Sequence, residues 1–87
     1  MAIRWTVTLS PLAQNRLNAA RAVIPGTALL FDALSLRLAH DPIQDATDIG
    51  NGLYALVLEP TSVIAMSVQV LYLVGEGKVL IKNLKFI

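Results

Sequence analysis

The sequence contains no cysteine and few charged residues. Charged side chains make up 15% of its 87 residues, whereas about 25% is usual in a soluble domain. Without cysteine the chain can form neither disulfides nor thiolate metal sites. Its longest unbroken apolar run, from Leu53 to Leu58, is far shorter than the about 20 residues of a membrane-spanning helix. The first residues also lack the basic start and apolar core of a signal peptide, so we expect a cytoplasmic protein that does not enter a membrane.

Apolar residues, by contrast, make up 55% of the chain. A chain of this length is expected to form one domain over residues 1–87, and so small a domain has a large surface for its volume. Some apolar side chains should therefore lie on a surface that faces a partner. This favours a homo-oligomer or an obligate partner protein, and a very well packed monomer is the alternative.

The polar residues form no recognisable metal or cofactor motif. Asp41, Asp45 and Asp48 have the wrong intervals for a calcium loop, and the glutamate that such a loop needs is missing. The two Gly-x-Gly segments are typical of turns rather than of phosphate-binding loops. The single histidine, His40, is expected to end a helix rather than to form a catalytic pair with Asp41. We therefore expect neither a cofactor nor a bound metal.

Alternation and capping signals predict a strand and a helical hairpin in the first half. Apolar and polar residues alternate over residues 3–9, as in a half-buried strand. Ser10-Pro11 suits the start of a helix, because serine caps free backbone amides and proline lacks an N–H where none is needed. Pro25-Gly26 ends this helix, and Thr27 is predicted to cap a second one that runs to about residue 40.

The second helix carries two apolar stripes. At about 100° per residue, one sector holds Leu30, Phe31, Leu34 and Leu38. The other sector holds Leu29, Ala33 and Leu36. A helix that is apolar on two sides packs against two things, so the first stripe should face the sheet. The second stripe should face the first helix, a partner or both, which makes it the candidate partner interface.

The second half is predicted to form a sheet. Residues 41–52, rich in aspartate and glycine, are typical of an irregular acidic loop. Three strands are expected after it, over residues 53–58, 63–74 and 78–87. They can pair as an antiparallel meander, with the helical hairpin on one sheet face. The expected fold class is α+β, with an N-terminal strand, a two-helix hairpin and a three-stranded antiparallel meander.

Five short motifs follow one another along the chain. They are W-T-V-T-L-S-P-L-A from Trp5, L-A-H-D-P from Leu38, G-L-Y-A-L from Gly52, V-Q-V-L-Y from Val68 and V-L-I from Val79. In order and spacing they resemble motifs of the RelE/ParE toxin superfamily, and the resemblance covers about residues 3–87. It implies the RelE/ParE fold and a toxin of a type II toxin–antitoxin pair, bound to an antitoxin peptide. In ribonuclease-type members it also implies ribosome-dependent mRNA cleavage.

The chain departs from that family where the family carries its chemistry. The characteristic arginines of the second and third strands fall on Ala55 and Gln69, and a basic pair in the last strand falls on Phe86 and Ile87. Cleavage in the family implies attack by a 2′-hydroxyl on the adjacent phosphate, which needs proton carriers and cations. The expected protein is therefore toxin-like and catalytically degenerate, and acts by binding protein.

The residues left for catalysis are Lys78, Lys82, Lys85 and a tyrosine such as Tyr72. In a regular strand Lys78 and Lys82 share one face and Lys85 lies on the other, which makes a poor phosphate clamp. Lysines in an edge strand also discourage unwanted strand pairing, and we favour this interpretation over catalysis.

Two alternatives to the degenerate toxin stay open. One is an active ribosome-dependent mRNA endoribonuclease, which would contact RNA and the ribosome. The other is a non-catalytic module that associates with itself through apolar surface. No residue argues for or against a further possibility, a ParE-like gyrase poison.

Overall fold

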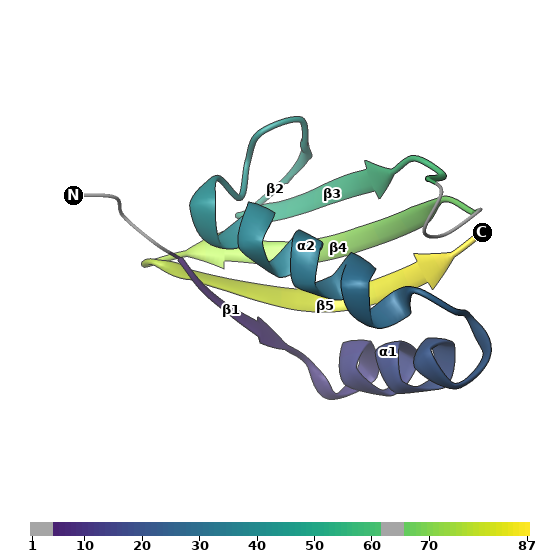
Figure 1. The fold of residues 1–87 in the computed structure, drawn as a ribbon. Helices are drawn as coiled ribbons and strands as arrows, with labels where there is room; N and C mark the ends of the chain where they lie inside the picture. Colours follow the sequence, from purple (N-terminus) through teal and green to yellow (C-terminus); the bar gives the residue numbers. More distant parts are fainter. Residues whose placement is uncertain (1–4, 62–65) are drawn as a thin grey trace.

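A computed structural model describes residues 5–61 and 66–87 of the chain. The helices in these ranges are α1 (Pro11–Val23) and α2 (Thr27–His40). The strands are β1 (Thr6–Leu9), β2 (Thr47–Gly50), β3 (Leu53–Leu58), β4 (Val68–Gly75) and β5 (Lys78–Phe86). Figure 1 shows both helices on the same face of one sheet. The predicted α+β class is confirmed.

The sheet is larger than the predicted three-stranded meander. Its order is β1-β5-β4-β3-β2. The meander is present as β3, β4 and β5, which are antiparallel neighbours. However, β1 pairs in parallel with β5, and β2 pairs antiparallel with β3, so the sheet is mixed and has five strands. Because β5 lies between β1 and β4, the prediction that its lysines protect an edge strand is wrong. Residues 63–65 and 3–4 of the predicted strands lie outside the described residues. Within the described part, the strands begin later than predicted, at Val68 for β4 and at Thr6 for β1.

The prediction of an irregular loop over residues 41–52 is wrong for its second half, where β2 forms. All four residues of β2 are exposed, so the strand carries no apolar alternation that would reveal it. The strand forms because Gly50, Asn51 and Gly52 all have positive φ angles and turn the chain back, so that β2 pairs with β3. Backbone hydrogen bonds to a neighbour, rather than side-chain burial, define it.

The start of α1 follows the prediction. The Ser10 hydroxyl oxygen accepts a hydrogen bond from the Ala13 backbone N–H at 3.2 Å, and Pro11 occupies the first helical position. The same hydroxyl donates to the Lys82 carbonyl oxygen at 2.9 Å. Ser10 therefore caps α1 and also ties its start to β5.

The prediction that Thr27 caps α2 is wrong. It is the first residue of the helix, and Gly26 takes the capping position with φ at 86°. The Thr27 hydroxyl instead donates to the Ile24 carbonyl oxygen at 2.8 Å, and the residue is buried. A left-handed backbone position suits glycine, so the Pro25-Gly26 turn leaves threonine one residue inside the helix.

The core lies between the two helices and the sheet face that they cover. Its buried members are Ala13, Leu17, Leu34, Leu38, Leu56, Val68, Val70, Tyr72, Val79, Ile81 and Leu84. Leu30 and Phe31 pack against this cluster while half-buried, so the first predicted stripe of α2 faces the sheet as expected. No helix in the described part of the chain is long and apolar enough to cross a membrane.

A bulge in β5 changes which residues share a sheet face. Leu71 pairs with Asn83 but Tyr72 pairs with Ile81, so Lys82 is an extra residue in β5. Before the bulge Val79 and Ile81 face the core, and after it Leu84 does. The prediction that Lys85 lies on the face opposite Lys78 assumed a regular strand and is wrong, because the extra residue returns Lys85 to the face of Lys78.

Candidate functional site

The sheet face turned away from the helices is the most distinctive surface of the protein. We call it the open face, and no helix in residues 5–61 or 66–87 covers it (Figure 1). Cross-strand pairing places on its three central strands Leu53, Ala55 and Val57 of β3, Gln69, Leu71 and Leu73 of β4, and Lys78, Leu80, Asn83 and Lys85 of β5. Six of these ten side chains are apolar, and most are only half-buried by their neighbours. The outer strands add exposed threonines to the same face, Thr6 and Thr8 of β1 and Thr47 of β2.

A cavity of about 280 Å³ lies on the open face. The side chains of that face that line it are Ala55, Val57, Gln69, Leu71, Asn83 and Lys85. Gln69 lies opposite Lys85 in the pairing of β4 with β5. Among these lining residues, Lys85 is the only charged group. The cavity therefore offers one cation, two amides and an apolar floor.

The three lysines considered for catalysis do not converge on this cavity. Lys78 lies at the hairpin end of β5, where it lines a separate hollow with Leu73, Glu76 and Leu80. Lys85 lies near the other end of the strand, roughly 20 Å away at about 3.3 Å per residue. Lys82 occupies the bulge and is exposed. Three cations spread along a strand cannot enclose a single phosphate group.

Tyr72 lies on the opposite side of the sheet from Lys85. Its side chain is fully buried in the core, and its ring stacks on Tyr54 with the centroids 6.1 Å apart. The hydroxyl donates a hydrogen bond to the Pro42 carbonyl oxygen. Tyr72 thus ties β4 to the segment that follows α2. A phenol held in this way is not available to a substrate on the open face.

The protein is expected to lose stability at alkaline pH through Tyr72. Burial raises the pKa of the Tyr72 hydroxyl from its ordinary value of 10.0, and the Arg37 guanidinium offsets part of the rise. Because this pKa is higher in the folded than in the unfolded state, the stabilisation is complete below about pH 10 and is lost as the pH rises through the folded-state pKa. Urea denaturation at a series of pH values across this range should show that the free energy of unfolding falls more steeply with pH in the wild type than in Tyr72→Phe. Equal slopes would contradict the expected coupling.

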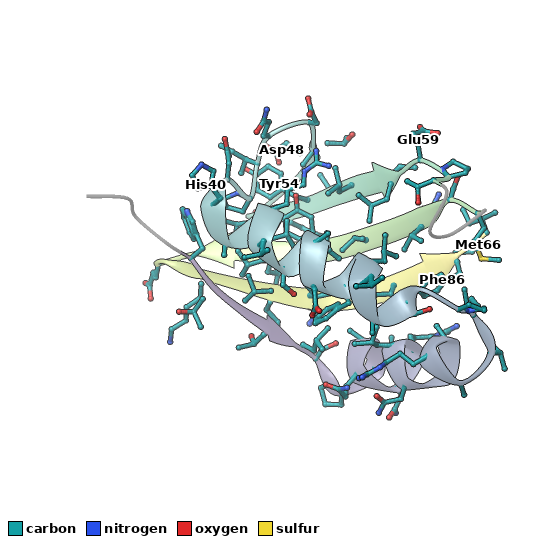
Figure 2. The ribbon with its side chains drawn as sticks, viewed as in Figure 1. His40, Asp48, Tyr54, Glu59, Met66 and Phe86 are labelled. Carbon is teal, nitrogen blue, oxygen red and sulfur yellow. The ribbon has the colours of Figure 1, made fainter. Side chains whose placement is uncertain are left out.

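The acidic residues near the end of α2 make local contacts rather than a metal site. Arg37 forms an ion pair with Asp45 at 3.3 Å, and the Asp48 carboxylate accepts a hydrogen bond from the Gly50 N–H at 2.8 Å. His40 is exposed in the last turn of α2, as predicted, and Figure 2 shows it and Asp48 on separate elements. The described residues contain no group of three side chains that could hold a metal ion.

The second apolar stripe of α2 is exposed. Leu29 and Leu36 are 65% and 64% exposed, and Ala33 between them is exposed as well. The first helix does not cover this stripe, so it stays the candidate partner interface of α2. The open face was not predicted from the sequence as a binding surface. The apolar run from Leu53 to Leu58 was a signal for it, because such a run indicates a strand that is apolar on both faces.

Comparison with protein-family models, with curated proteins and with solved structures found no match to this chain.

Proposed function

We propose that the protein is a RelE/ParE-like component of a type II toxin–antitoxin pair that has lost catalytic activity and acts by binding protein. The observation that supports this most is the lining of the cavity on the open face. Ala55 and Gln69, the positions where the family resemblance places arginines, lie together in that lining. Two guanidinium groups there would face one substrate phosphate, whereas the Ala55 methyl group donates no hydrogen bond and the neutral Gln69 amide stabilises developing negative charge less than a guanidinium does.

The partner of this component is an amphipathic antitoxin segment, and the exposed stripe of α2 is its binding surface. Leu29 and Leu36 lie seven residues apart, which is two helical turns, so their side chains project from the same side of α2. A helix with apolar side chains at intervals of three and four residues would pack its own stripe along them. The Arg37 ion pair with Asp45 beside this stripe supplies a polar rim.

Coexpression with the product of the adjacent reading frame is expected to give a stable complex, and expression of the chain alone is expected to leave growth unimpaired. Replacing both Leu29 and Leu36 with lysine should abolish copurification, because it places two charges in the apolar contact. The matched control is Leu12→Lys, because Leu12 is 49% exposed and lies on the other helix, α1. Loss of the complex in the control as well would contradict the proposal. So would a wild-type chain that does not copurify with the product of the adjacent reading frame.

One observation favours the active endoribonuclease as the second candidate. The bulge in β5 brings Lys85 onto the open face, where it lines the same cavity as Asn83 and Gln69. A single lysine can stabilise one phosphate oxygen, but the tyrosines that could carry protons lie on the other face. Growth arrest and cut transcripts on expression of the chain alone would favour this candidate over the degenerate toxin.

A further inference from the structure

The central strands of the open face carry a contiguous group of half-buried leucines. Leu53, Leu71, Leu73 and Leu80 lie side by side on its three central strands, in the cross-strand pairs Leu53 with Leu73 and Leu73 with Leu80. Val57 of the same face is 50% exposed. A contiguous apolar face of this kind is typical of an interaction surface.

We infer that a second copy of the chain covers the open face, with the two sheets face to face about a two-fold axis that runs along β4. The order of the strands supports this axis, because β4 is the central strand, with two neighbours on each side. Rotation about β4 places β5 of each copy over β3 of the other and leaves Leu71 of both copies against each other at the axis. Every apolar strand of one face then meets an apolar strand of the other.

The charges on the open face select this axis over the alternative. Lys85 of β5 lies in register with Gln69 and, through it, with Val57 of β3. Glu59 follows β3 directly, at the same end of the sheet as Phe86, the residue after Lys85; Figure 2 shows both on the right-hand side. The proposed rotation therefore brings Lys85 of each copy toward Glu59 of the other, twice by symmetry.

A two-fold axis across the strands gives the opposite result. It lays β5 on β5 with the ends reversed, so that Lys85 of one copy meets Lys78 of the other. Like charges at an interface are costly, and complementary ones set its register. The acidic counterpart of Lys85 is thus supplied only when the axis follows the strands.

The area of the face fits a weak, reversible dimer. Five strands at about 4.8 Å spacing and about six residues of each at 3.4 Å give roughly 500 Å² per copy, or about 1,000 Å² in total. Stable interfaces start near this value, and those at the low end are transient. We therefore expect dissociation in the micromolar range. This inference does not depend on the proposed function, which uses the stripe of α2.

Sedimentation equilibrium at concentrations up to about 500 µM tests the dimer. The wild type should dimerise, and Leu71→Lys should raise the dissociation constant by about 100-fold or more, because it places two like charges together at the axis. Leu71 projects on the open face, so this variant should keep the wild-type circular dichroism spectrum. Leu12→Lys on α1 is the matched control and should dimerise normally.

A charge exchange tests the axis itself. Glu59→Lys and Lys85→Glu should each weaken the dimer about tenfold, and the double variant should return to within about threefold of the wild type. If the double variant dimerises as weakly as the sum of the two single effects predicts, the proposed axis is wrong. A wild type that stays monomeric, or a dimer that survives Leu71→Lys but is lost in Leu29→Lys/Leu36→Lys, would overturn the inference. A monomeric chain that uses its open face to bind the protein encoded by the adjacent reading frame would also overturn the inference.

Discussion

Leu38→Ala is expected to lower the free energy of unfolding by about 3 kcal/mol. Leu38 is 1% exposed and lies in the core where α2 packs on the sheet. The substitution removes buried methyl groups and leaves a cavity, while alanine keeps the helix propensity. A domain of this size is stabilised by only about 4–13 kcal/mol in total, so the midpoint of thermal unfolding should fall by roughly 12–24 °C.

Leu36→Ala on the same helix is the matched control. Leu36 is 64% exposed and packs against no described part of the core, so the same chemical change should cost less than about 0.5 kcal/mol. Chemical denaturation of the two variants under one set of conditions gives the comparison. Similar losses in both would mean that the inner and outer stripes of α2 are assigned to the wrong sides.

The two stripes of α2 show how far the sequence alone carries the fold. Spacing at about 100° per residue separated Leu34 and Leu38, which are buried, from Leu29 and Leu36, which are exposed. The pattern could be predicted because a regular helix fixes the direction of each side chain. The start of α1 at Ser10 could be predicted for a similar reason, since the capping residue acts on amides only three positions away.

Elements defined by backbone pairing rather than by side-chain burial escaped prediction. The strand β2 has no buried side chain, and pairing with β3 is what defines it. The parallel placement of β1 beside β5 joins residues more than 70 positions apart. Apolar periodicity reports neither arrangement, because β2 has no buried face and the partner of β1 lies at the other end of the chain.

The candidate site was partly predictable in the same sense. The resemblance singled out Ala55 and Gln69, and the structure places both in one cavity. The presence of Lys85 in that cavity depends on the bulge at Lys82, which shifts every later residue of β5 to the other face. An extra residue in one strand is visible only in its register with the next strand, so regular alternation gave the wrong face for Lys85.

Gly52→Ala is expected to cost about 3 kcal/mol of folding free energy, a loss that combines two effects. Gly52 has φ at +80°, in the left-handed region that disfavours side chains. A Cβ atom there would also lie 2.9 Å from the Val74 carbonyl oxygen, which is backbone and cannot swing aside. The Gly52 carbonyl oxygen accepts the hydrogen bond of the Val74 N–H at 2.8 Å, so relief of the clash would strain the junction of β3 with β4.

Gly77→Ala separates the two effects. Gly77 has nearly the same backbone angle, with φ at +75°, but a Cβ atom there would meet nothing within 4 Å. It should therefore show only the conformational cost, about 1 kcal/mol. Thermal unfolding of both variants measures the difference, which we expect to be roughly 2 kcal/mol and to report the steric contact with β4. Equal losses at the two glycines would show that β3 and β4 can move apart at this turn, and the pairing of Leu53 with Leu73, on which the open face depends, would then be less rigid than its register implies.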